Sequence, residues 1–311
     1  MDAEIVIFGG NAHPELADEI CSYLGAPRSP VVTTRFANDC LQVQLQANCR
    51  ERDVYIIQPL VPPVQENLVE LLLMADAARG ASAARVTAVM SHYAYARSDK
   101  KDAPRISIGG RLVADLLVTA GVNRVLTLTL HSPEVHGFFS VPVDHLHALR
   151  ELAAHFRQRD LSRAVVLSPD LGYAKSAAAF ARRLGLPVAA GAKERFSDEK
   201  VSISSIIGDV ADRDVIIVDD EIARGTTMLE LLSVLRGHEP RSISVACTHG
   251  LFAAGSLEKL AAEVDEVVCT NSAPVPAEHP RLQVLSVAPA LAEAISRIHD
   301  GESVSALFEP V

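Results

Sequence analysis

Short apolar runs alternate with amphipathic stretches along the whole of this sequence. The best-defined run, at 215–218, has no period-two alternation, which is typical of a strand covered on both faces of a parallel sheet. The pattern predicts strands at 5–8, 31–34, 41–45, 54–58, 85–90, 124–130, 164–167, 215–218, 242–247, 266–270 and 283–286. It predicts helices at 15–24, 65–78, 111–120, 149–156, 255–262 and 288–299, with one more ending at 184 and another starting at 228.

Strands and helices alternate from one end of the chain to the other, which predicts an α/β fold of mainly parallel sheets flanked by helices. At 311 residues the chain is long enough for two domains of ordinary size. The second half repeats the first in kind, so two similar domains are expected. We place them at 1–147 and 148–311, and the last helix has the option of packing back on the first domain.

Composition narrows the class of protein. The net charge of −10 argues against a nucleic-acid partner, which needs a clustered basic surface. Five cysteines without a CxxC pair read as reduced thiols. No apolar run approaches the roughly 20 residues of a membrane span, and the start MDAEIVIFGG is a strand rather than a signal peptide. A cytoplasmic α/β enzyme is therefore expected.

The stretch DVIIVDDEIARGTTM, residues 214–228, is the feature around which the chain is organised. An apolar strand stops at Asp219 and Asp220, a short turn follows, and a helix then begins. Two carboxylates can accept hydrogen bonds from vicinal sugar hydroxyls, while turn amides and a helix amino terminus favour a phosphate. This order predicts a sugar-phosphate site. The alternative is that the acids and threonines only cap the helix.

Other segments carry candidate ligand contacts. SHYAYARSDKKDAPRISIGG is locally basic and follows the carboxyl end of a strand, where open α/β sheets place ligands, although such runs are usually solvated surface. Phe36 either stacks on a base or is an ordinary core residue. His131 ends a strand without metal-ligand spacing and suits a single metal or phosphate contact. The turn GGNAHP fits a phosphate contact or, more simply, a strand-to-helix connection.

Several ordered motifs are specific together: DVYIIQP, YARSDKKD, HGFFSVPVD, SPDLGYAKSAAAFARRLG, KER, IIGDV, the acidic pair, THGLF and LAEAISRIHDGESVS. With them the chain resembles the ribose-phosphate pyrophosphokinase family, also called phosphoribosyl pyrophosphate synthetase, along its whole length. The resemblance implies two type I phosphoribosyltransferase-like domains, an ATP-side domain followed by a ribose-5-phosphate-binding domain. It also implies transfer of the β,γ-pyrophosphoryl group of MgATP to the C1 hydroxyl of ribose 5-phosphate, with release of AMP.

The resemblance also implies residue roles. The residues expected to hold the ribose and its phosphate are Asp219, Asp220, Arg224, Gly225, Thr226 and Thr227. Those expected at the ATP site are Phe36, Asn38, Arg97, Asp99 and His131. Those expected to bind Mg2+ are His131 and Asp170. The expected catalytic set is Lys193, Arg195 and His131. Cations suit that set because phosphoryl-type transfer depends on compensating charge at the moving oxygens.

Some positions depart from the family pattern. Where the family usually reads DDxxDTGGT, this chain reads DDEIARGTT, with Ala223 at the third acid and Arg224 at the first Thr. Arg224 either binds the phosphate through charge-assisted hydrogen bonds or fills the phosphate pocket. Cys40 stands at an adenine-contacting Glu, and Thr129 and Ser140 stand at two acids, which weakens the expected Mg2+ binding.

The principal hypothesis is an active ribose-phosphate diphosphokinase that uses ATP, ribose 5-phosphate and Mg2+. The altered turn keeps two alternatives open: a non-catalytic regulatory homologue that assembles with an active synthetase, and a related kinase with a different pentose phosphate. A phosphoribosyltransferase is disfavoured because the two-domain layout and the basic loop have no role in that reaction. By resemblance the chain is expected to form a homo-oligomer, a dimer or hexamer, without nucleic-acid or membrane partners.

Overall fold

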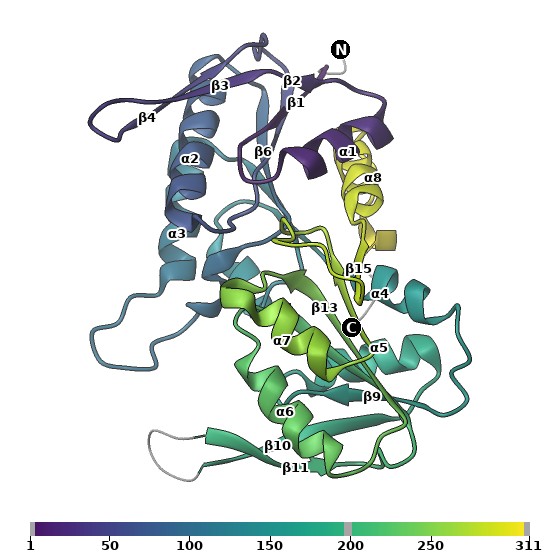
Figure 1. Cartoon of the computed structure of the whole chain (residues 1–311). Helices are drawn as coiled ribbons and strands as arrows, with labels where there is room; N and C mark the ends of the chain where they lie inside the picture. Colours follow the sequence, from purple (N-terminus) through teal and green to yellow (C-terminus); the bar gives the residue numbers. More distant parts are fainter. Residues whose placement is uncertain (1–3, 196–200, 308–311) are drawn as a thin grey trace. The chain divides into compact units, whose positions relative to one another are not determined.

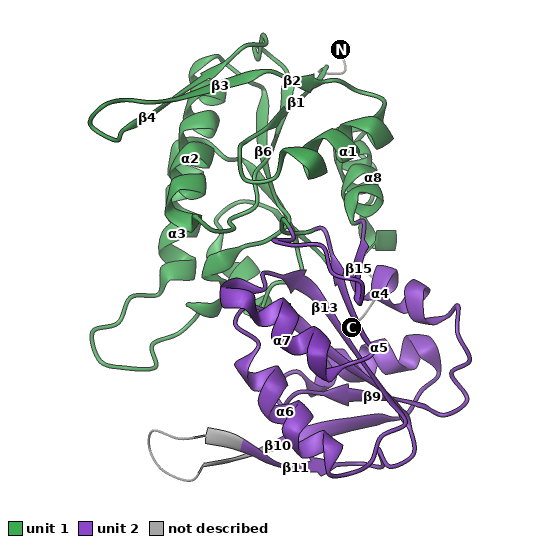
Figure 2. Cartoon of the chain, viewed as in Figure 1, with its two compact units in different colours: residues 1–147, 272–274, 287–308 green, residues 148–271, 275–286, 309–311 purple. Residues whose placement is uncertain are grey.

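The computed structural model describes residues 4–195 and 201–307, without the side chains of 193–195 and 201–202. The chain divides into two compact units, coloured separately in Figure 2. Unit 1 contains residues 1–147, 272–274 and 287–308, and unit 2 contains residues 148–271, 275–286 and 309–311. The last helix, α8 (Ala288–His299), thus belongs to unit 1 although it follows unit 2 in the sequence.

Unit 1 is built on a six-stranded parallel sheet with the order β2-β1-β5-β6-β7-β8. The strands are β1 (Ile5–Gly9), β2 (Arg28–Ser29), β5 (Asp53–Ile57), β6 (Arg85–Met90), β7 (Arg124–Leu128) and β8 (Val143–Leu146). Strand β5 is buried along its whole length, because helices cover both faces of the sheet. These helices are α2 (Val64–Gly80) beside α3 (Gly109–Ala120), and α1 (Pro14–Leu24) beside α8 (Figure 1).

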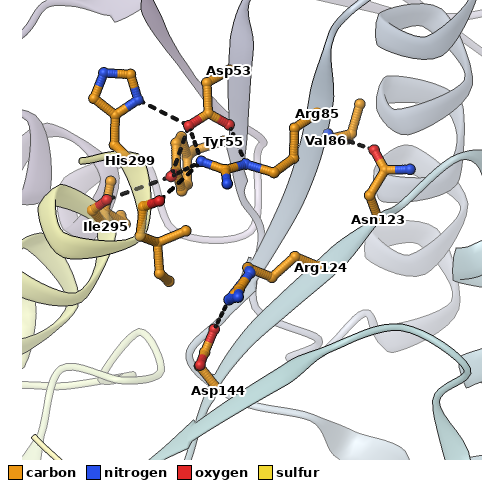
Figure 3. Close-up of polar contacts among 10 residues, drawn as sticks. Asp53, Tyr55, Arg85, Val86, Asn123, Arg124, Asp144, Ile295 and His299 are labelled. Carbon is orange, nitrogen blue, oxygen red and sulfur yellow. Dashed lines mark hydrogen bonds and ion pairs between the residues drawn. The ribbon is translucent and has the colours of Figure 1, made fainter. Parts of the chain in front are cut away.

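A polar cluster joins α8 to the sheet of unit 1 (Figure 3). The buried carboxylate of Asp53 accepts hydrogen bonds from Arg85 Nε at 2.8 Å and from the Tyr55 hydroxyl at 3.1 Å, and His299 Nδ1 lies 2.9 Å from it. Arg85 also donates to the carbonyl of Ile298 at 3.1 Å. Burial alone would raise the pKa of Asp53, but the bonds from Arg85 and His299 outweigh it and lower that pKa. The cluster therefore holds ionised Asp53 beneath the end of α8.

Strands β3 (Val31–Arg35) and β4 (Leu41–Leu45) form an antiparallel hairpin that is separate from the main sheet. Val31, Val43 and Leu45 alternate with exposed residues and pack on the core of unit 1. This alternation is the pattern of a hairpin with one covered face. The two neighbouring strands predicted at 31–34 and 41–45 are thereby confirmed, and they pair with each other.

Unit 2 has a seven-stranded sheet with the order β11-β10-β9-β12-β13-β14-β15, parallel except where β10 meets β11. The strands are β9 (Ala164–Ser168), β10 (Val188–Arg195), β11 (Val201–Ile207), β12 (Asp214–Ile222), β13 (Ser242–Gly250), β14 (Glu266–Thr270) and β15 (Leu282–Leu285). The helices are α4 (Leu149–Phe156), α5 (Ala174–Leu184), α6 (Thr226–Arg236) and α7 (Ser256–Glu263).

Successive residues of β12 point into two different cores of unit 2. Val215 and Ile217 pack in the core that holds the apolar residues of α6 and α7. Ile216 and Val218 pack in the core that holds those of α4 and α5. A strand buried on both faces needs apolar residues at every position, which is why this run shows no period of two. The predicted α/β class with two similar units is confirmed.

Several boundaries differ from the sequence prediction, three of them beside candidate ligand residues. Strand β12 does not stop at residue 218 but continues through the two acids to Ile222. Helix α6 begins at Thr226, two residues before the predicted start at 228. Strand β7 ends at Leu128, whereas the prediction ran to residue 130, and the unpredicted β8 pairs with it in parallel.

Candidate functional site

The acidic pair lies at the carboxyl end of β12, in the middle of the unit 2 sheet. Asp219 is half-buried, Asp220 is buried, and the main-chain N–H of Asp220 donates to Asp219 Oδ1 at 2.9 Å. Burial, and next the negative charge of Asp220, raise the pKa of Asp219 well above its usual value. Poorly solvated carboxylate charge is therefore concentrated at the edge where open α/β sheets bind ligands.

Asp170 reaches the same edge from the neighbouring strand. It follows the end of β9, which is adjacent and parallel to β12, so the carboxyl ends of the two strands coincide. Its charge adds to the forces that raise the pKa of Asp219. The main-chain N–H of Tyr173 donates to Asp170 Oδ1 at 3.1 Å. Burial, followed by the charges of Asp220 and Asp219, raises the pKa of the Tyr173 phenol well above its usual value.

Sequence reasoning gave Tyr173 no role. The residue lies in the quoted motif SPDLGYAK, but only the adjacency of β9 and β12 brings its hydroxyl near the acidic pair. A tyrosine after a strand end, within a few residues of an acid, was the available signal. The structure thus brings together Asp170, Asp219 and Asp220 as expected, and adds a phenol to them.

The turn after β12 is shaped for a close approach to main-chain groups. Gly225 adopts φ 69° and ψ 9°, a left-handed conformation that strains any residue with a side chain, and it directly precedes α6. The carbonyl of Ala223 accepts hydrogen bonds from Ala253 N–H at 2.8 Å and from Ser256 Oγ at 3.2 Å. With the turn fixed in this way, the first N–H groups of α6 form an anion-binding helix start.

Three side chains of this turn are exposed: Arg224, Thr226 and Thr227. Among the described residues no hydrogen bond or ion pair engages the Arg224 guanidinium, and no side-chain cap satisfies the start of α6. Arg224 is therefore an accessible cation next to an anion-binding helix start. This observation favours the first of its two sequence interpretations, in which it contacts the phosphate rather than filling the pocket.

The residues predicted to bind Mg2+ lie in different units. His131 is exposed, just past β7 in unit 1, whereas Asp170 is in unit 2. Thr129 and Leu130 directly precede His131. Thr129 has a left-handed φ of 42°, and Leu130 N–H donates to His145 Nε2 at 2.8 Å. The fold therefore holds the main chain that leads into His131 in an unusual, hydrogen-bonded conformation.

Within the described ranges, no group of three or more His, Cys, Asp or Glu side chains is placed to hold a metal ion alone. Mg2+ is usually bound by one or two carboxylates together with substrate phosphates and water. The repulsion between Asp219, Asp220 and Asp170 makes their edge suitable for a cation shared in that way. The donor set therefore fits Mg2+ that arrives with a phosphate ligand better than a permanently bound ion.

The residues predicted for the ATP side are all in unit 1. Phe36 and Asn38 are in the turn between β3 and β4, and Phe36 is 48% exposed rather than buried. Its interpretation as an ordinary core residue is therefore wrong. Asn38 Oδ1 accepts a hydrogen bond from Cys40 N–H at 3.3 Å, which shapes the turn. Arg97 ends a short 3-10 helix (Ala94–Arg97) after β6, and Asp99 follows two residues later.

Lys193 and Arg195 are on β10, which pairs with antiparallel β11 and has a register shift between Ala192 and Lys193. Their side chains lie outside the part of the chain that is described. That they are the catalytic cations therefore stays a prediction, whereas their expected place on a loop is wrong. The main chain places both of them in a strand up to Arg195.

Fold and site together define an α/β protein whose second unit carries a close pair of carboxylates followed directly by a glycine-led helix start. The comparison with known proteins is specific. A sequence model of the N-terminal domain of ribose phosphate pyrophosphokinase matches residues 5–121, and one of the phosphoribosyl synthetase-associated domain matches residues 193–309. The chain belongs to the ribose-phosphate pyrophosphokinase family, and by that membership it is a diphosphate-transferring enzyme.

Individual relatives cover the chain almost completely. A putative ribose-phosphate pyrophosphokinase of Streptomyces coelicolor is 71% identical over 310 residues, 98% of each chain. The ribose-phosphate pyrophosphokinase of Deinococcus radiodurans is 48% identical over 312 residues, again 98% of each chain. The crystal structure of phosphoribosylpyrophosphate synthetase from Mycobacterium smegmatis superposes with a TM-score of 0.91 at 35% identity, over 96% of this chain and 99% of that one.

A separate observation concerns membranes. In the part of the chain that is described, no helix combines the length and the apolar character that crossing a bilayer demands.

Proposed function

We propose that this chain transfers the β,γ-pyrophosphoryl group of MgATP to the C1 hydroxyl of ribose 5-phosphate, giving phosphoribosyl pyrophosphate and AMP. The observation that carries this proposal is the desolvated acidic pair of β12 followed directly by the glycine-led start of α6. The acidic pair suits vicinal hydroxyls, and the helix start suits a terminal phosphate. One short turn separates the two. A cytoplasmic homo-oligomer, dimeric or hexameric, is proposed on family grounds alone.

On the ribose side, Asp219 and Asp220 accept hydrogen bonds from the 2- and 3-hydroxyls and so orient the sugar. Its 5-phosphate sits against the main-chain N–H groups of Gly225, Thr226 and Thr227. Arg224 donates charge-assisted hydrogen bonds to the same phosphate. Support comes from the exposure of the three side chains and from the left-handed Gly225, which lets main chain approach the ligand closely.

On the nucleotide side, Phe36 stacks on adenine and Asn38 contacts its edge. Arg97 and Asp99 line the triphosphate path. Support comes from the exposure of Phe36 at the tip of the hairpin, which leaves the aromatic side chain accessible to a planar ligand. The main-chain turn around Asn38 is held by Phe36 N–H donating to the Cys40 carbonyl at 2.8 Å.

The chemical step depends on charge and alignment. Lys193, Arg195 and His131 neutralise negative charge that develops on the transferred group, and Asp219 and Asp220 hold the ribose so that its C1 hydroxyl faces that group. His131 and Asp170 are the residues that would contact Mg2+ arriving with the ATP phosphates, and the ion would supply further charge neutralisation. The C1 oxygen bonds to the β-phosphorus, the bond from that phosphorus to the oxygen of AMP breaks, and the hydroxyl proton is released to solvent.

The proposal is tested by incubating the purified chain with MgATP and ribose 5-phosphate and measuring AMP and phosphoribosyl pyrophosphate together. We expect stoichiometric formation of both products, and loss of both when EDTA removes Mg2+. Lys193→Ala is the matched variant: turnover should fall by orders of magnitude with a smaller change in KM, because its role is in the transition state. AMP at background level with the unmodified chain rejects the proposal.

The altered turn DDEIARGTT supports a second candidate, a regulatory homologue that assembles with an active synthetase. In that case the chain alone gives no turnover, copurifies with an active paralogue and changes its rate. A competent homo-oligomer counts against this candidate. The third possibility, another pentose phosphate, is tested by comparing ribose 5-phosphate with ribose 1-phosphate under the same conditions.

A further inference from the structure

The β3–β4 hairpin depends on side chains for its position. In the described structure it forms a two-stranded sheet of its own, with no main-chain pairing to the main sheet. Hairpins of two strands are marginally stable by themselves in water. Figure 1 shows the hairpin lying alongside α2, and β4 contacts that helix. What fixes the hairpin on α2 therefore also fixes the turn that carries Phe36 and Asn38.

Two polar contacts join β3 to α2. We call the contact of Glu70 the lower rung and the contact of Glu66 the upper rung. Thr33 Oγ1 donates to Glu70 Oε1 at 2.6 Å, and Arg35 Nη2 lies 2.5 Å from Glu66 Oε1. Residues four apart on a helix share a face and are separated by about 6 Å along the axis. Residues two apart on a strand also share a face, at about 6.8 Å. Thr33 and Arg35 thus lie on one face of β3, Glu66 and Glu70 lie on one face of α2, and the two contacts set which face of the hairpin is turned toward the helix.

The lower rung is buried and strongly held. Glu70 is 2% exposed, and its carboxylate also accepts hydrogen bonds from Asn11 N at 3.0 Å, Asn11 Nδ2 at 2.5 Å and Gln58 Nε2 at 2.6 Å. A carboxylate has about four acceptor positions, and donors from three segments occupy them here. Within the described residues Glu70 has no ion pair, so its charge is stabilised by these hydrogen bonds and is not available to a distant cation.

The turn GGNAHP is part of the same arrangement. A Cβ on Gly10 would lie 2.2 Å from Gln58 Oε1, and that oxygen accepts a hydrogen bond from Ala12 N–H at 3.1 Å. Gly10 is therefore needed for the close approach of Gln58, which in turn donates to Glu70. Of the two sequence interpretations of this turn, the simple connection between β1 and α1 accounts for the glycine. The turn and the hairpin share one carboxylate.

The upper rung extends into the turn itself. Arg35 also contacts Asp39 Oδ1 through Nη1 at 2.5 Å, and Asp39 adopts a left-handed φ of 70°. One guanidinium thus bridges Glu66 on α2 and Asp39 beyond Phe36 and Asn38. Both partners are largely exposed, so this contact is weak alone and screened by salt. It guides the turn only because the buried rung holds the strand below it.

We propose that Glu70, with Glu66 above it, is a positioning residue for nucleotide binding: through Thr33 and Arg35 it holds the hairpin so that Phe36 and Asn38 face adenine. The role of the turn in binding adenine rests on the proposed function. The anchoring of the hairpin on α2 does not. Losing the buried rung lets the turn sample other positions, so nucleotide binding weakens while the sugar site of unit 2 is left intact.

The discriminating variant is Thr33→Val, which removes one hydroxyl and leaves the other three bonds of Glu70 in place. We expect the KM for ATP to rise about tenfold, as the loss of a hydrogen bond to a charged acceptor implies, with kcat and the KM for ribose 5-phosphate unchanged. Thr34→Val is the matched control, since Thr34 is exposed on the opposite face of β3. It should behave as the unmodified chain. A rise in both KM values, or equal effects of the two variants, overturns the proposal.

A second readout needs no turnover. The chain has no tryptophan, so Phe36→Trp introduces a single fluorophore at the tip of the hairpin. We expect its fluorescence anisotropy to fall when Thr33→Val is added and to stay constant when Thr34→Val is added. Constant anisotropy with both overturns the anchoring. A selective fall in anisotropy, together with no AMP formation by the unmodified chain, keeps the anchoring and rejects the proposed function instead.

Discussion

Arg224 is the residue for which the structure favours one of two sequence interpretations. Its side chain is exposed beside the start of α6, where no described residue pairs with it, so it is available to a ligand. We therefore predict that Arg224→Thr raises the KM for ribose 5-phosphate by about tenfold or more, because a charge-assisted hydrogen bond to phosphate is lost. Initial rates over a range of ribose 5-phosphate at saturating ATP measure this effect.

The control for Arg224 lies at the other end of the same helix. Arg236→Thr removes an exposed arginine that pairs with Glu263, and it should leave the KM unchanged. Tighter binding in Arg224→Thr would instead mean that the guanidinium obstructs the phosphate, which is the second interpretation of the sequence.

Asp219 is a residue where function costs stability. Burial and the charge of Asp220 raise its pKa, so at pH values above its unfolded pKa this carboxyl makes the folded state less stable. Asp219→Asn keeps the oxygen that accepts from Asp220 N–H and removes the charge. We predict that it stabilises the protein by about 1 kcal/mol and raises the KM for ribose 5-phosphate. Urea unfolding and initial rates measure the two effects.

The same substitution at Asp214 is expected to change stability in the opposite direction. It begins β12, and the hydrogen bond from Arg241 Nε at 2.8 Å, with that from Ser242, outweighs burial and lowers its pKa. Asp214→Asn should therefore destabilise the protein and leave the kinetics unchanged. If both variants lose stability, desolvation and repulsion do not dominate at Asp219.

At the scale of elements, β12 shows what the sequence pattern can and cannot predict. Its apolar part was recognisable because four consecutive buried positions need four apolar residues. Its end was not, because the strand continues past the acids through main-chain pairing of Glu221 with His249 and of Ile222 with Gly250. Pairing with a neighbouring strand is invisible to side-chain periodicity. The acids are therefore in the strand rather than after it.

The candidate site was predictable to a similar extent. The acidic pair, Asp170 and the helix start could be named because short motifs of the sequence carry them. Tyr173 and Glu70 could not, because their roles depend on which strands and helices are adjacent. Cross-element contacts of this kind have no local signature. The exposure of Phe36 likewise follows from the hairpin lying outside the main sheet.

The attachment of α8 to β5 through Asp53 is the element-scale contact with a clear pH dependence. Asp53 is 4% exposed in its side chain and pairs with Arg85 and His299. We predict that Asp53→Asn lowers the free energy of unfolding by about 3 kcal/mol, since it leaves a partly buried guanidinium without its partner. Because the folded pKa of Asp53 is lowered, its contribution is complete above the unfolded value near 3.9 and is lost as the pH falls through the folded pKa.

Urea unfolding at about pH 7 and about pH 3 checks both parts of this prediction, and the deficit of the variant should shrink in acid. Asp144→Asn is the contrasting variant. Burial raises the pKa of Asp144 despite Arg124 at 2.9 Å, so its ionisation costs stability as the pH rises. A deficit at Asp53 that grows in acid would contradict the assignment.

At the scale of the whole molecule, the sequence was sufficient for the family and the α/β class but not for the composition of the units. The motifs run in order from one end to the other, which identifies homology without a fold. Unit 1, however, takes up residues 272–274 and 287–308 after the chain has built most of unit 2. The sequence left open that the last helix packs back on the first domain, but it could not decide the matter, because the apolar face of α8 fits any covered sheet equally well.

Because α8 belongs to unit 1, a destabilising substitution in this helix should affect unit 1 rather than the adjacent segment of unit 2. Ile295 is fully buried on α8, the helix that packs against α1. We predict that Ile295→Ala costs about 2–4 kcal/mol and that hydrogen exchange accelerates in residues 5–57 of unit 1, far away in sequence, rather than in the adjacent residues 275–286 of unit 2. Glu293→Ala, at an exposed position of the same helix, should change neither. Accelerated exchange confined to 275–286 would mean that α8 stabilises its sequence neighbours, and that its contacts with α1 and β5 contribute little to unit 1.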